Sequence, residues 1–120
     1  MVISAPGLDL RTAVPVVAVG GALGALARFG ISTALTSSWA TVLVNLVGCL
    51  LLGLLVGARR EDLLLRAFAG TGVLGGFTTM STFAVEADRL DPGAAVAYVA
   101  VSVVGGLALA RVGLRLASRR

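Results

Sequence analysis

The sequence contains no histidine and no lysine, and it has a single cysteine, Cys49. One cysteine cannot build a disulfide framework, and its place inside an apolar run is typical of a small packing residue. Without histidine, and without a cluster of cysteines or carboxylates at ligand spacing, the side chains offer no metal site. No paired carboxylates and no nucleophile–base pair lie within the apolar runs, so the sequence predicts no enzyme.

Charged residues are scarce as well. Only 13% of the 120 residues are charged while 58% are apolar, and the mean hydropathy is +1.00. A small domain has a large surface that polar residues must cover in water, so we expect lipid to cover this one. The pI near 11.1 does not indicate nucleic-acid binding, because aromatics are few and the ten arginines lie mostly beside apolar runs.

Four long apolar runs fill most of the chain. A helix of about 20 residues crosses a hydrocarbon core of roughly 30 Å, and each run is long enough. Polar turns separate the runs, and Pro92-Gly93 is typical of a break before the fourth. The sequence predicts one all-α transmembrane domain over residues 1–120, with four transmembrane helices at residues 13–35, 39–58, 63–88 and 94–116.

The arginines are distributed unevenly about these spans. Four spans place both termini and the loop between the second and third span on one side. Eight arginines fall on or near that side, and only Arg89 lies in the loops of the other. Because cytoplasmic loops carry an excess of arginine and lysine, we expect both termini to be cytoplasmic in the cell inner (plasma) membrane. The eight are Arg11, Arg59, Arg60, Arg66, Arg111, Arg115, Arg119 and Arg120.

Polar side chains inside the spans are the candidate functional groups. Arg28 lies within the first span, where an arginine near the centre costs roughly 2.5–3.5 kcal/mol on insertion scales. It can attract an anion into a vestibule or pair with a structural ion or carbonyl. Asn45 shares a helix face with Thr41, and its amide can join helices or donate to an anion. Tyr98 and Ser102, also four residues apart, form a weaker donor row.

The third run contains two adjacent glycines and four hydroxyl residues between Gly75 and Thr82. These residues weaken a continuous helix, and non-helical backbone persists at membrane depth only where protein or a water-filled cavity satisfies it. A broken helix exposes carbonyls that can hold a cation and amides that favour anions. The alternative is an unbroken helix with a packing face of small residues.

Three segments of the chain resemble the signatures of one known family. They are GGALGALAR at residues 20–28, TVLVNLVG at 41–48 and GGFTTMSTF at 75–83. With their spacing and the chain length, they resemble the Fluc fluoride channels, also called CrcB proteins. The resemblance covers all four helices in order. It implies a fluoride-specific ion channel subunit that lets fluoride leave passively and so lowers its cytoplasmic concentration.

The resemblance also implies an assembly. Two subunits pack as an antiparallel dimer with two pores, and the third helix of each is broken mid-membrane. Backbone carbonyls at Gly75 and Thr78 hold a structural sodium ion at the dimer centre, and Arg28 faces a vestibule. Hydroxyl and amide donors suit a strongly hydrated anion that must be released again, although they do not select fluoride over chloride. The implied fluoride pore residues are Asn45, Phe83, Met80, Ser81, Thr82, Thr41, Tyr98 and Ser102.

Two features depart from the family pattern. Met80 stands where the family usually has phenylalanine, and its thioether offers no aromatic edge to an anion. This leaves open an altered or inactive pore, and with it a non-conducting structural partner subunit of a paired fluoride channel. The arginine bias should fix one orientation, so we expect a related chain of opposite orientation as the partner, and otherwise a homodimer. A proton-coupled small multidrug-type exporter needs a titratable group at membrane depth, and the first span has no acid.

Overall fold

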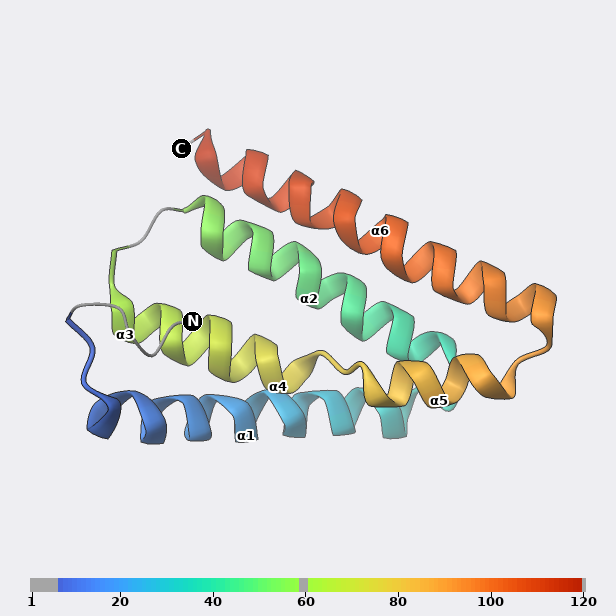
Figure 1. Cartoon of the computed structure of the whole chain (residues 1–120), viewed down its shortest axis with the longest axis horizontal. Coiled ribbons are helices and arrows are strands. Elements are labelled where there is room, and N and C mark those ends of the chain that lie inside the picture. The colour runs from blue at the N-terminus through green and yellow to red at the C-terminus, as the bar shows by residue number, and fades with distance from the viewer. Residues whose placement is uncertain (1–6, 59–60, 120) are drawn as a thin grey trace.

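The computed structural model describes residues 7–58 and 61–119, and every regular element in these two ranges is a helix (Figure 1). Four stretches are long and apolar enough to cross a membrane: Leu10–Ala34, Trp39–Gly57, Leu63–Arg89 and Pro92–Ser118. The predicted all-α fold with four candidate spans is confirmed. The elements are α1 (Leu10–Ala34), α2 (Trp39–Gly57), α3 (Leu63–Leu65), the π-helical segment η2 (Arg66–Leu74), α4 (Gly75–Phe77), α5 (Ser81–Arg89) and α6 (Pro92–Ser118).

Side-chain caps explain why two helices begin earlier than their apolar runs. The Asp9 carboxylate accepts from the backbone N–H of Arg11 at 3.3 Å, so α1 begins at Leu10 and not at residue 13. Asp91 accepts from the N–H of Ala94 at 3.1 Å, and α6 begins at Pro92. Proline fits the first position of a helix because its missing N–H would have no helical partner there. The proline therefore starts the helix and does not lie in a turn before it.

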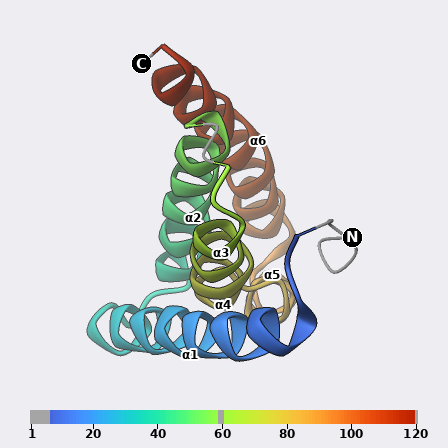
Figure 2. The same ribbon diagram turned by 90° about the vertical axis from the view of Figure 1, so that its left-hand side faces the viewer.

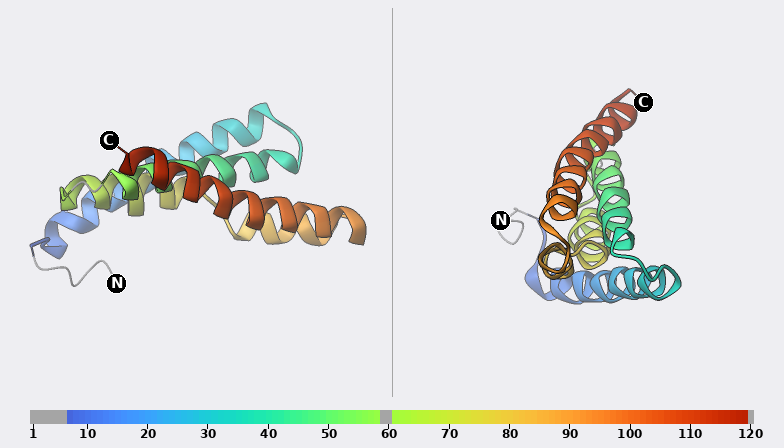
Figure 3. Two further views of the ribbon diagram at one scale, coloured as in Figure 1. Left: turned by 90° about the horizontal axis from the view of Figure 1, so that it is seen from above. Right: turned by 90° about the vertical axis from the view of Figure 1, so that its right-hand side faces the viewer.

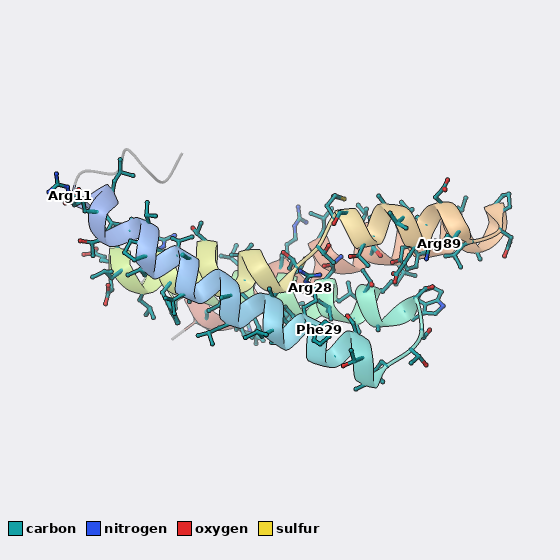
Figure 4. All side chains as sticks on the ribbon, turned by 90° about the horizontal axis from the view of Figure 1, so that it is seen from below. Arg11, Arg28, Phe29 and Arg89 are labelled. Atoms are coloured by element: carbon teal, nitrogen blue, oxygen red, sulfur yellow. The ribbon has the colours of Figure 1, made fainter. Side chains whose placement is uncertain are left out.

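The helices alternate in direction along the long axis of the molecule. In Figure 1, α1 and the stretch from α3 to α5 run one way, and α2 and α6 run the other way. The starts of α1 and α3 thus share one end with the ends of α2 and α6, while Figure 4 shows Arg89 far from Arg11 along the molecule. Arg59, Arg60 and Arg120, which belong to the predicted arginine-rich side, lie outside the described residues.

The helices pack as two pairs. α2 packs along α6, and α1 packs on η2 and α4. In the end-on view of Figure 2, α1 runs across the foot of the molecule while α2 and α6 rise side by side, and Figure 3 shows the same arrangement from the opposite end. Glycines allow these approaches: a Cβ on Gly53 would overlap the Ala110 carbonyl, and one on Gly113 would overlap the Leu50 carbonyl. Small residues at these positions bring helix backbones into contact.

The third stretch is built from several pieces. α3, η2 and α4 follow one another directly, and α4 ends at Phe77. Thr78 then adopts an extended backbone with ψ of 155°, and α5 begins at Ser81. Residues 78–80 are here called the α4–α5 connection, and Figure 1 draws them as a thin coil between the ribbons of α4 and α5. The sequence predicted a span over residues 63–88 that is weakened between Gly75 and Thr82, and it gave no sign of the π-helical segment.

Candidate functional site

Asn45 on α2 holds the α4–α5 connection through both ends of its amide. Its Oδ1 accepts from the backbone N–H of Thr79 at 2.9 Å, and its Nδ2 donates to the Thr79 carbonyl at 3.0 Å. In a continuous helix the Thr79 N–H would bond the carbonyl four residues earlier, that of Gly75. The asparagine thus replaces a helical bond. An amide NH₂ carries two N–H donors, so one of them remains available for an anion.

Hydroxyl groups satisfy the backbone on both sides of the connection. Thr78 donates from its N–H and its Oγ1 to the Leu74 carbonyl, each at 3.0 Å. Thr79 Oγ1 accepts from the Thr82 N–H at 3.3 Å, which caps the start of α5, and it lies 3.4 Å from the Ser81 hydroxyl. These bonds stabilise the exposed ends of two helices. Thr79 was not among the predicted residues although it bonds both Asn45 and the Thr82 N–H, and its place in the hydroxyl-rich motif was the signal for it.

Tyr98 on α6 is the buried centre of an aromatic and polar row. The side chain is fully buried, and its hydroxyl donates to Glu86 Oε2 at 2.7 Å. Phe83 stacks on the tyrosine ring at a centroid distance of 5.1 Å, and Trp39 meets it edge-on at 5.7 Å. Ser102 Oγ donates to the Tyr98 carbonyl at 2.8 Å. Sequence reasoning missed Glu86, although its position three residues after Phe83 places the two on one helix face.

A hollow of about 390 Å³ gathers six of the predicted residues, from α2, α4, α5, α6 and the α4–α5 connection. It opens on the surface, where the side chain of Met80 is 76% exposed. Thr41 is buried and lines a separate polar hollow of about 260 Å³, which also includes Glu86 and Arg89. Ser81, Thr82, Tyr98 and Arg28 line neither of these two hollows. The predicted residues that line the larger hollow are Asn45, Gly75, Thr78, Met80, Phe83 and Ser102.

Comparison with known proteins identifies the family. The family model described as CrcB-like protein, Camphor Resistance (CrcB), matches residues 15–114. The chain belongs to the CrcB family. Among its relatives, fluoride-specific ion channel FluC 1 of Rhodococcus jostii is 49% identical over 89% of this chain and 86% of its own length. FluC 2 of Thermobifida fusca is 46% identical over 76% of this chain and 77% of its own length. FluC 2 of Bacillus subtilis is 44% identical over 84% of this chain and 84% of its own length.

In this CrcB chain, the end of α4 presents carbonyl oxygens that a helix would otherwise use. The N–H of Thr79 goes to Asn45, so the Gly75 carbonyl loses its partner four residues on. Gly75 and Thr78 both line the larger hollow. Carbonyls at the end of a half-helix suit a monovalent cation such as sodium. Two oxygens do not surround an ion, so these residues would supply only part of a cation site.

Arg28 lies beside the same half-helix of the CrcB chain, on its other side. Its Nε donates to the Gly76 carbonyl at 3.2 Å, and the bond is partly buried. Figure 4 shows Arg28 on α1 near the α4–α5 connection, with Phe29 next to it along the helix. The sequence left two roles open for Arg28, attracting an anion or pairing with an ion or carbonyl. The contact with Gly76 is a pairing with a carbonyl.

Proposed function

We propose that the chain is a subunit of a fluoride-specific ion channel and conducts fluoride passively out of the cell. Channels of this kind move an ion and catalyse no covalent reaction, so the chain is not an enzyme. The relatives named fluoride-specific channels match most of its length. The observation that carries the proposal is Asn45, an amide donor on the largely apolar α2, which lines the larger hollow beside the α4–α5 connection.

The proposed path uses weak donors in succession. The remaining N–H of Asn45 donates to the anion, and the positive edge of the Phe83 ring faces it. Ser102 lines the same hollow, and the hydroxyls of Ser81 and Thr82 continue the path beyond it. Neutral donors replace water around the ion without trapping it, because conduction requires that each site also release what it binds. Thr41 and Tyr98 extend the row toward the second, polar hollow.

A structural sodium ion at the centre of a dimer completes the proposal. The backbone carbonyls of Gly75 and Thr78 would hold it, and its positive charge would favour an anion nearby. The third span then breaks within the membrane at residues 78–80. Because two carbonyls make half a site, a second subunit supplies the other half.

The proposed partner lies antiparallel in the membrane. Support comes from the larger hollow, which is open where Met80 is exposed, so a second chain would cover it. We propose a paralogue of opposite orientation as the partner, and otherwise a second copy of this chain. Both termini would face the cytoplasm from the inner (plasma) membrane, because the arginines gather at the end of the molecule where α6 ends.

Fluoride-electrode measurements on proteoliposomes test the function. Liposomes loaded with fluoride and containing the chain, alone or with a candidate partner, should release fluoride faster than empty liposomes. Chloride-loaded liposomes serve as the selectivity control. The absence of fluoride release with every partner would contradict the proposal. Release only in the presence of a partner, unaffected by substitutions at Asn45 and Phe83, would instead favour a non-conducting structural partner subunit, the reading that Met80 supports.

A further inference from the structure

One face of α1 continues from two glycines to Arg28. Gly20, Gly24 and Arg28 are spaced by four residues and therefore share a face. A Cβ on Gly20 would overlap the Phe68 carbonyl oxygen, and one on Gly24 would overlap the Val73 carbonyl oxygen. The two glycines thus press α1 backbone to backbone against η2. One turn further on, this contact places the arginine at the end of α4.

The carbonyl that Arg28 contacts is one that the helix leaves unpaired. A helix ends with carbonyls that have no N–H partner within it, and they carry partial negative charge that favours a cation. α4 ends at Phe77, so the Gly76 carbonyl belongs to this set. The guanidinium Nε donates to it at 3.2 Å. This is a charge-assisted bond between residues 48 positions apart in the sequence.

The residues on either side of this bond border a different surface from Gly76. Gly75 and Thr78 line the larger hollow, whereas Gly76 is not among its lining residues. A Cβ on Gly76 would overlap the Gly21 carbonyl oxygen, so this part of α4 lies directly against α1. Arg28 therefore fixes the rotation of the half-helix about its axis at the point where its carbonyls diverge.

We propose that Arg28 is a positioning residue for a cation site. By holding the Gly76 carbonyl against α1, it keeps the Gly75 and Thr78 carbonyls directed to the hollow, where a monovalent cation binds. The inference rests on the proposed function. It differs from a vestibule role, in which Arg28 acts on the anion through its charge alone. The two roles differ in what Arg28→Lys does, because lysine keeps the charge but not the planar group that donates from Nε.

Isotope labelling can observe this bond directly. Gly76-Phe77 is the one Gly-Phe pair in the sequence, so carbonyl-¹³C glycine with ¹⁵N phenylalanine selects a single peptide group. In the full-length channel in lipid, this carbonyl signal should move upfield in Arg28→Lys and Arg28→Met, because the carbonyl loses its donor. Arg111→Met, which removes an exposed arginine of α6, is the control and should leave the signal in place. An unmoved signal in both Arg28 variants would overturn the inference.

Sodium titration of fluoride release then separates the two roles of Arg28. Raising sodium should increase release by the unaltered channel, and Arg28→Lys should need about fivefold more sodium for half-maximal release, the effect of losing about one net hydrogen bond. A lysine variant with unchanged sodium dependence overturns the positioning role. Fluoride release that does not depend on the sodium concentration also overturns the positioning role, while the proposed function stands. If no fluoride is released, the function fails, and the carbonyl signal still decides whether Arg28 positions Gly76.

Discussion

Asn45 illustrates, at the scale of one residue, how a side chain can take over the work of a backbone. Its amide bonds both the N–H and the carbonyl of Thr79, at 2.9 and 3.0 Å. A buried N–H or carbonyl without a partner costs about 1–3 kcal/mol, so Asn45 stabilises the α4–α5 connection from α2. The same amide is the proposed donor to fluoride, so one side chain would both hold the α4–α5 connection and bind the conducted ion.

Asn45→Asp should abolish fluoride release. The aspartate keeps an acceptor for the Thr79 N–H but turns the Nδ2 donor into an oxygen that faces the Thr79 carbonyl and repels the anion. Fluoride release from liposomes measures conduction, and thermal unfolding in detergent should show a loss of about 1–3 kcal/mol of stability. Cys49→Ala, at another residue lining the larger hollow, is the control. Release at the unaltered rate would remove Asn45 from the path.

Met80→Phe should leave folding unchanged and keep or raise fluoride release. Its side chain is 76% exposed in the single chain, so a ring meets no packed core, and the ring adds a positive edge that can face the anion. Phe83→Ile, which removes the ring stacked on Tyr98, should reduce release. The electrode assay compares the two, and identical rates for both variants and the unaltered chain would show that neither position lines a working pore.

The site could be predicted in part because polar groups are conspicuous in apolar runs. Asn45, Arg28 and Tyr98 stand out in this way from the sequence alone. Their partners do not, since the bond of Asn45 joins residues 34 apart and that of Arg28 joins residues 48 apart. Such pairs exist only once the helices have packed. Glu86 escaped notice for the same reason, because its partner Tyr98 belongs to the next helix.

At the scale of the elements, glycines decide which helices touch. On α1 the same residue type occurs in two environments: a Cβ on Gly24 would overlap the backbone of Val73, whereas nothing lies within 4 Å of one on Gly30. Sequence spacing indicates that such glycines allow close packing, but it does not say which partner they face. The four candidate spans followed from hydropathy, whereas the starts of α1 and α6 depend on the caps at Asp9 and Asp91. The division of the third stretch did not follow from hydropathy, because the N–H of Thr79 is taken by another helix.

Gly24→Ala should destabilise the protein, and Gly30→Ala should stabilise it. The added methyl at position 24 forces α1 away from η2, and such overpacking costs about 1–3 kcal/mol. At position 30 the methyl has open space, and alanine in a helix gains about 0.5–1 kcal/mol over glycine. Denaturant titration of the purified channel in detergent measures both changes. Equal stability of the two variants would contradict the backbone contact between α1 and η2.

At the scale of the whole molecule, the chain has an end rich in arginine and a surface rich in apolar side chains. Arg11 and Arg66 lie at the starts of α1 and η2, and Arg115 lies in the last turn of α6. Alternating helix directions bring these to one end (Figure 1). Large apolar side chains such as Leu26, Phe29 and Val96 are exposed, as expected of a surface covered by lipid or by a second chain.

The chain should insert in one orientation only. Reporter tags at the C-terminus should be protected from membrane-impermeant labels in intact cells and become accessible after the membrane is opened. The physical reason is the arginine bias, because positively charged flanks stay in the cytoplasm. The matched variant weakens the bias by replacing Arg115 and Arg119 with Gln and adding arginines beside Arg89. Equal labelling of the unaltered chain on both faces would refute the fixed orientation and favour an antiparallel homodimer.

The bond between Arg28 and Gly76 has a consequence for how the chain is made. α1 leaves the ribosome well before residue 76 is synthesised, so Arg28 enters the bilayer without its carbonyl partner. An unpaired arginine at membrane depth costs roughly 2.5–3.5 kcal/mol on insertion scales. The valines and leucines of α1, among them Val14, Leu23 and Leu26, must carry the helix across alone. The polar contact of α1 thus forms only after α4 has been synthesised, so the order of synthesis affects how the chain folds.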